Sequence, residues 1–143
     1  GTTVTACLKR EGEILICQVG DSRAYLLRGN RIFQLTEDHS LVQELVKSGG
    51  ITEEEAFTHP QKNVLTRAVG TGLILDVDLY RYNVFSGDLL LLCTDGLTRY
   101  MRQDELLRTI NLSFDLDAAV RDLLKKANSC GGADNITIIL VEF

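Results

Sequence analysis

Short strand-like segments separated by glycine-containing turns constrain the fold of this chain more than any other feature of its sequence. These segments are residues 2–9, 13–19, 22–28 and 31–35, and the turns between them fall at Gly12, Gly20-Asp21 and Gly29-Asn30. Tight turns of this kind connect antiparallel strands. The first third of the chain is therefore predicted to be a meander of antiparallel strands.

Two short helices are predicted next, each beginning with a capping box. The first box pairs Ser40 with Gln43, and the second pairs Thr52 with Glu55. In this motif the side chain of the first residue caps the helix, and the side chain three positions on bonds back to it. A proline after His59 ends the second helix, because the residue before proline avoids the helical conformation.

The rest of the chain alternates between loop, strand and helix. Residues 61–72 are polar and irregular, with glycines at 70 and 72, and are predicted to form a long exposed loop or flap. Strands are expected at 78–83, 88–94 and 136–141, and helices at 104–110 and 117–128. The apolar run Leu89–Cys93 is typical of a strand buried on both faces. Runs of strands, then helices, then strands favour an α+β sandwich of two antiparallel β-sheets over a repeated βαβ fold.

Composition excludes several classes of protein. With 143 residues, 45% of them apolar, the chain can bury the core of one domain. Its net charge of −5 and its lack of a basic stripe argue against a nucleic-acid partner. The longest apolar run is far shorter than the roughly 20 residues that span a bilayer, so no membrane association is expected.

The four cysteines include no Cys-x-x-Cys pair. They are Cys7, Cys17, Cys93 and Cys130. A core of this size needs no disulfide, so we expect reduced, buried thiols and a cytoplasmic location. A zinc site has little support, because His39 and His59 lie far from any cysteine pair.

Three aspartates stand where predicted strands begin or end. Asp95 follows the apolar run of residues 89–93, and Asp134 precedes the final strand. If these strands are antiparallel neighbours, both carboxylates lie at one edge of the sheet, and Asp21 can join them there. Converging carboxylates suit a hard divalent cation, which can activate water and neutralise phosphate oxygens. The alternative is that each aspartate only caps a turn.

A serine hydrolase is a weaker hypothesis. Gly20-Asp21-Ser22 is similar to a nucleophile block with Ser22 as the nucleophile, but no histidine follows His59 to act as its base. Phosphate-binding, dinucleotide-binding and zinc-protease motifs do not occur.

Five motifs, taken together and in this order, resemble the bacterial form of the metal-dependent protein serine/threonine phosphatases of type 2C. They are Gly-Asp-Ser-Arg-Ala-Tyr at 20–25, Thr-Glu-Asp-His-Ser at 36–40, Asn-Val-Leu-Thr-Arg-Ala-Val-Gly at 63–70, Leu-Cys-Thr-Asp-Gly-Leu at 92–97 and Gly-Ala-Asp-Asn-Ile-Thr at 132–137. The resemblance implies two antiparallel sheets flanked by helices, with a pair of Mn²⁺ or Mg²⁺ ions at one end.

The resemblance also implies roles for individual residues. Asp95 and Asp134 would bind the same ion, and Asp21 would hold a third, weaker one. Asn135 would orient the carboxylate next to it, and Gly96 would support the site beside Asp95. No catalytic group beyond these ligands is expected in the chain.

The expected activity is removal of phosphate from phosphoserine or phosphothreonine proteins, the targets of a serine/threonine kinase, by metal-activated water. A helical flap over residues 38–66 would border the substrate. His39 and Arg67 are expected to be structural, and Arg23 to form an ion pair at the edge of the sheet rather than to bind phosphate.

The sequence departs from the family in one respect. The Asp-Gly-x-Gly-Gly motif, whose aspartate bridges both ions in the family, does not occur in this chain. The isolated chain is therefore expected to have little phosphatase activity, and sheet edges left without partners would favour self-association. A non-catalytic binding or regulatory module and a generic antiparallel domain remain as alternatives.

Overall fold

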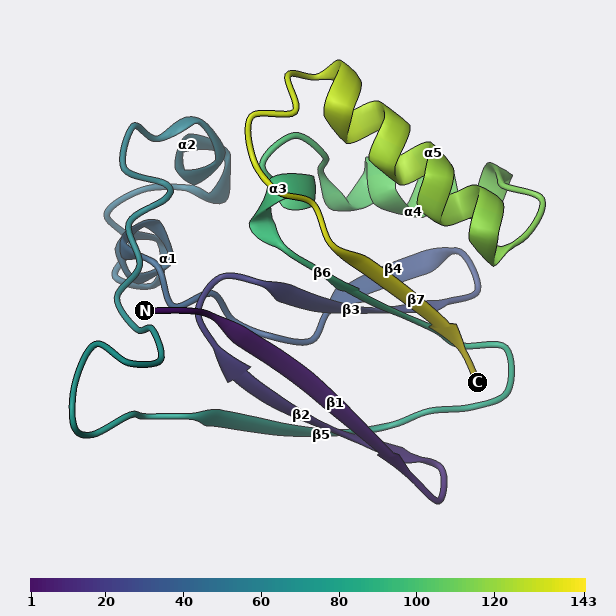
Figure 1. Cartoon of the computed structure of the whole chain (residues 1–143), viewed down its shortest axis with the longest axis horizontal. Coiled ribbons are helices and arrows are strands. Elements are labelled where there is room, and N and C mark those ends of the chain that lie inside the picture. The colour runs from purple at the N-terminus through teal and green to yellow at the C-terminus, as the bar shows by residue number, and fades with distance from the viewer.

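The computed structural model describes all 143 residues and contains two antiparallel sheets (Figure 1). The first sheet has the order β1-β2-β5, with bounds Val4–Arg10, Glu13–Val19 and Asp78–Asn83. The second sheet has the order β4-β3-β6-β7, with bounds Arg31–Gln34, Arg23–Arg28, Leu89–Cys93 and Ile138–Glu142. This arrangement confirms the predicted α+β sandwich.

The helices lie in two groups. Figure 1 shows α4 and α5 on the side of the second sheet that faces away from the first, while α1 and α2 stand at one end. The helices are α1 (Leu41–Lys47), α2 (Glu53–Thr58), α3 (Asp95–Thr98), α4 (Gln103–Leu112) and α5 (Leu116–Ser129). The capping box at Thr52 is present. At Ser40 only half of the predicted box forms, because Ser40 Oγ accepts from the Gln43 N–H without a bond in return.

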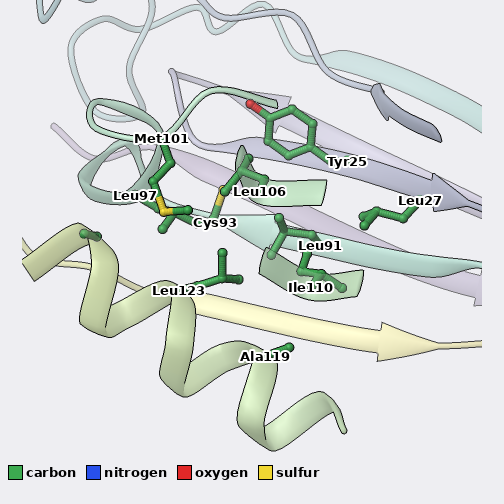
Figure 2. Packing of buried hydrophobic residues seen from close by; sticks show 11 residues of the cluster. Tyr25, Leu27, Leu91, Cys93, Leu97, Met101, Leu106, Ile110, Ala119 and Leu123 are labelled. Atoms are coloured by element: carbon green, nitrogen blue, oxygen red, sulfur yellow. The ribbon is translucent and has the colours of Figure 1, made fainter. Parts of the chain in front are cut away.

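Two apolar clusters share strand β6. Leu90 packs with Ile14 and Ile16 between the two sheets. Leu91 points the other way, into a cluster that includes Leu123 of α5 (Figure 2). Successive side chains of a strand face opposite sides. Residues 89–93 are therefore apolar throughout because both faces of β6 are covered, as predicted.

The predicted meander is wrong at one place. The chain leaves the first sheet after β2 and enters the second sheet at β3, so the two strands do not pair; β2 pairs with β5 and β3 with β6. Gly20 makes this crossing with a φ of +109°, in the left-handed region that favours glycine. A Cβ atom there would lie 2.3 Å from Thr3 Cγ2, so no larger residue fits.

The cysteines are only partly as predicted. All four thiols are free, but Cys130 is exposed, Cys7 and Cys17 are half-buried, and only Cys93 is buried. Burial raises the pKa of Cys93 to about 12, which keeps that thiol protonated and unreactive. Cys130 is exposed because it follows the last turn of α5, outside the apolar stripe.

The outer face of the first sheet is not covered by any helix. Leu8 and Leu79 are 62% and 78% exposed there. Side chains of β1, β2 and β5 line an apolar hollow of about 540 Å³ on this face. None of the helices is long and apolar enough to cross a membrane.

Candidate metal centre

Strands β6 and β7 bring two of the predicted aspartates to one edge of the second sheet. The strands are antiparallel neighbours and pair Cys93 with Ile138. Beyond this pair, the Thr94 N–H donates to the Thr137 carbonyl at 3.1 Å, and the Thr137 N–H donates to Thr94 Oγ1 at 2.9 Å. These bonds hold the segment that carries Asp95 against the loop that carries Asp134.

Arg99 links the two carboxylates. Its Nη1 lies 2.9 Å from Asp134 Oδ2, and its Nη2 bonds to Asp95 Oδ2. The short helix α3 begins at Asp95 and places Arg99 one turn later, on the same side. The predicted convergence of the two aspartates is thus confirmed. This convergence argues against the alternative of a generic antiparallel domain, in which Asp95 and Asp134 would lie at opposite ends of the sheet.

Gly96 allows the two segments to approach closely. A Cβ atom at Gly96 would lie 2.3 Å from the Asn135 carbonyl oxygen, and no shift of a flexible side chain could relieve that contact. The Asn135 N–H donates to Asp134 Oδ1 at 2.8 Å. Asn135 therefore contacts the neighbouring carboxylate through its backbone, while the residue itself is exposed.

Asp21 lies on the wall of the same cavity as Asp95. Burial, followed by the negative charges of Asp95 and Asp38, raises the pKa of Asp21 to about 6. A carboxyl group that is costly to ionise among other acids gains most from a nearby cation. The positive charge of Arg99 acts in the opposite direction and lowers that pKa.

The donor set fits a divalent cation but does not complete a site. Asp95 and Asp134 already share one positive charge, the Arg99 guanidinium, and carboxylate oxygens are ligands for Mg²⁺ and similar ions. No three carboxylate, imidazole or thiol side chains in the chain are grouped closely enough to hold a metal ion. Asp21 is not brought into one ligand group with the other two.

Asp21 and Asp95, but not Asp134, line a cavity of about 520 Å³ together with residues of the helical segment 38–66. In the wall of this cavity, Arg102 donates to both carboxylate oxygens of Glu54, at 2.5 and 2.6 Å. The Arg102 guanidinium also lies over the Phe57 ring, 4.4 Å from its centre. These contacts attach α2 to the segment before α4.

The residues predicted to be structural are held in polar networks. Arg23 donates to Asp38 through Nε and Nη2 and to the Tyr25 hydroxyl through Nη1, which confirms the predicted ion pair. Asp78 binds both His39 and Arg67, at 3.1 and 2.8 Å.

Sequence reasoning missed Arg99 and Arg102. The separation of four residues between Asp95 and Arg99 was the available signal, and it would have required α3 to be predicted. The pairing of Arg102 with Glu54 joins positions far apart in the sequence, and no local pattern marks it.

The family model for protein phosphatase 2C matches residues 1–140, almost the whole chain. The chain belongs to the protein phosphatase 2C family. Relatives include the serine/threonine phosphatase stp of Listeria welshimeri, 44% identical over 142 residues, and the protein phosphatase PhpP of Streptococcus pneumoniae, 40% identical over 141 residues. The chain covers 56% and 57% of these two proteins, so it spans little more than half their length.

Solved structures of family members have the same fold. The serine/threonine phosphatase Stp1 of Staphylococcus aureus superposes with a TM-score of 0.94 at 39% identity. The superposition includes 99% of this chain and 56% of the Stp1 chain. The Mycobacterium tuberculosis phosphatase PstP/Ppp gives a TM-score of 0.93 at 35% identity, with 99% and 59% covered. A third structure is the catalytic domain of the phosphatase PstP in complex with two manganese ions. It is 34% identical, with a TM-score of 0.85, over 98% of this chain and 57% of the PstP chain.

Proposed function

We propose that this chain forms part of a metal-dependent protein phosphatase that removes phosphate from phosphoserine and phosphothreonine. The observation that carries this proposal is the meeting of Asp95 and Asp134 around a single positive charge at one edge of the second sheet. Family membership supports the same reaction. The chain spans 56% of its relative from Listeria, so the activity is proposed for a protein that includes this chain.

Each aspartate has a proposed role. Asp95 and Asp134 would bind one Mn²⁺ or Mg²⁺ ion, and Asp21 would hold a further, weaker ion. Such ions, when bound, neutralise phosphoryl oxygens and lower the pKa of a water molecule. The Asn135 N–H fixes one oxygen of Asp134 and leaves the other for a cation, while Gly96 keeps the two loops close.

The chain by itself is proposed to bind metal weakly and to have little activity. Two carboxylates around one cation are fewer ligands than a divalent ion takes, and no group of three is present. The two manganese ions of the PstP complex support a metal-dependent reaction in the complete domain.

The substrates are proposed to be phosphoproteins, the targets of a serine/threonine kinase. The cavity beside Asp21 and Asp95 is open enough to admit a peptide side chain, and the segment 38–66 would act as a flap at its border. Four free thiols support a reducing, cytoplasmic setting.

Self-association is also proposed for the isolated chain. Its surface combines the uncovered apolar face of the first sheet with edge strands β1 and β7, each hydrogen-bonded to only one neighbour. Such edges pair readily with another chain.

The test is Mn²⁺-dependent hydrolysis of a phosphothreonine peptide by the full-length protein, in the parent form and as Asp95→Asn or Asp134→Asn. Each substitution should reduce turnover by more than the roughly 10–100-fold that loss of a supporting residue costs. Asp76→Asn, in an exposed loop, is the control and should retain full activity. Equal activity in all four proteins would refute the roles proposed for Asp95 and Asp134, and no activity in the parent would favour a non-catalytic module.

A further inference from the structure

The Arg99 guanidinium lies between the two carboxylates that are proposed to hold a metal ion. Its guanidinium bonds to one oxygen of Asp95 and one of Asp134. A divalent cation that used the same two oxygens would face a positive charge at close range. The guanidinium and the ion therefore cannot both use these two oxygens.

The guanidinium is incompletely bonded in this position. Its Nε is buried and has no hydrogen-bond partner. Arg23 provides a contrast inside the same cavity wall, because its Nε, Nη1 and Nη2 all donate to Asp38 or Tyr25. Leaving a buried donor without a partner costs free energy. Arg23 is thus fixed in the fold, whereas Arg99 can be displaced with less loss.

The cavity beside Asp95 offers space for a displaced Arg99 side chain. Its side chain is 24% exposed and lines the cavity that lies beside Asp95. Glu53 and Asp104 contribute acidic groups to the same wall. A released guanidinium would remain in a negatively charged environment and at the end of a flexible side chain.

We propose that Arg99 is an internal cation that competes with the metal ion for Asp95 and Asp134. In the absence of metal it holds the two loops together and offsets the repulsion between the carboxylates. Metal binding displaces it into the cavity. This inference rests on the proposed function, because it takes these two aspartates to be metal ligands.

The experiment measures Mn²⁺ binding by the 143-residue chain from the electron paramagnetic resonance signal of the free ion. Arg99→Gln should lower the dissociation constant by about tenfold or more, because the ion no longer has to break two charge-assisted bonds. Arg99→Lys should lie between the parent and Arg99→Gln, since one ammonium cannot bridge both carboxylates as a guanidinium does. Arg108→Gln removes an exposed arginine and should bind as the parent does.

Thermal unfolding gives a second readout. Without metal, Arg99→Gln should unfold at a lower temperature than the parent, and Mn²⁺ should raise its midpoint by more than it raises that of the parent. The inference is wrong if Arg99→Gln binds Mn²⁺ no more tightly than the parent, including the case in which neither binds.

Three variants separate this inference from the proposed function. In the double variant Asp95→Asn/Arg99→Gln, the gain in affinity should disappear; a gain that persists would show that the ion binds elsewhere, which overturns both proposals. If Asp95→Asn and Asp134→Asn each weaken Mn²⁺ binding while Arg99→Gln leaves it unchanged, the ligands stand and the competition by Arg99 is wrong.

Discussion

Gly20 and His39 hold each other through two hydrogen bonds that run in opposite directions. The backbone N–H of His39 donates to the Gly20 carbonyl at 2.9 Å, and the backbone N–H of Gly20 donates to the ring nitrogen Nδ1 of His39 at 3.1 Å. The other ring nitrogen, Nε2, lies 3.1 Å from Asp78 Oδ2 and donates to it. His39 is 4% exposed, so the turn that carries Asp21 is fixed from inside the protein.

Replacing His39 should therefore loosen that turn. His39→Ala leaves the buried Gly20 N–H without an acceptor and should lower the free energy of unfolding by about 1–3 kcal/mol. His39→Asn places an amide oxygen near the position of Nδ1 and should lose less. Urea unfolding measures the stability, and hydrogen exchange of the Gly20 amide locates the effect. His59→Ala is the control, because His59 is half-buried and its Nδ1 accepts only an exposed N–H, that of Gln61; an equal loss there would contradict the prediction.

Gly96→Ala should push the two aspartate-bearing segments apart. Its Cβ would lie 2.3 Å from the Asn135 carbonyl oxygen, and the backbone at that point has to move. We expect a loss of about 1–3 kcal/mol in the free energy of unfolding, as for overpacked sites. Gly72→Ala is a matched control, because the nearest atom to its Cβ lies at 3.7 Å. Equal unfolding midpoints for the two variants would refute this explanation of Gly96.

Protonation of Asp88 in acid should lower the stability of the chain, because it weakens the ion pair between Asp88 and Arg28. Arg28 donates to both of its oxygens, at 2.9 and 2.7 Å, and holds the pKa of this buried carboxyl below its ordinary value of 3.8. Because the pKa is lower in the folded state, this stabilisation is present above about pH 4 and is lost as the pH falls below it.

Asp88→Asn tests this pH dependence. The variant should be less stable than the parent at pH 7, and the difference should shrink as the pH falls below about 4. Guanidinium unfolding at a series of pH values measures the difference, with Asp76→Asn as the exposed control. A difference that stays constant from pH 7 down to pH 3 would contradict the proposed ion pair.

Leu79→Lys should reduce self-association of the isolated chain. Leu79 is 78% exposed on the uncovered face, on the edge strand β5, where a charge opposes apolar contact and strand pairing. Sedimentation velocity should show the parent forming dimers or larger species with rising concentration and the variant remaining monomeric. Phe114→Lys removes an even more exposed apolar side chain, outside this face, and should behave as the parent does. A parent that is monomeric at every concentration would refute the proposal.

Much of the fold followed from local patterns. The predicted bounds of strand β2 at 13–19 and strand β5 at 78–83 match the observed ones. Alternating or β-branched runs between turns indicate a strand without any information from distant residues. The apolar stripe of 117–128 likewise marked α5. The placement of Asp95 and Asp134 at one edge followed from the antiparallel pairing of the strands that carry them.

The tertiary structure alone decided the remaining features. A turn at Gly20 is compatible with a hairpin or with a crossing between sheets, and the crossing occurs because β2 pairs with β5, nearly sixty residues further on. The bridge from Arg99 to Asp134 joins groups 35 positions apart. Sequence patterns report the conformation of neighbouring residues, whereas the choice of sheet partner and the sharing of a charge depend on which distant side chains the packed core brings into contact.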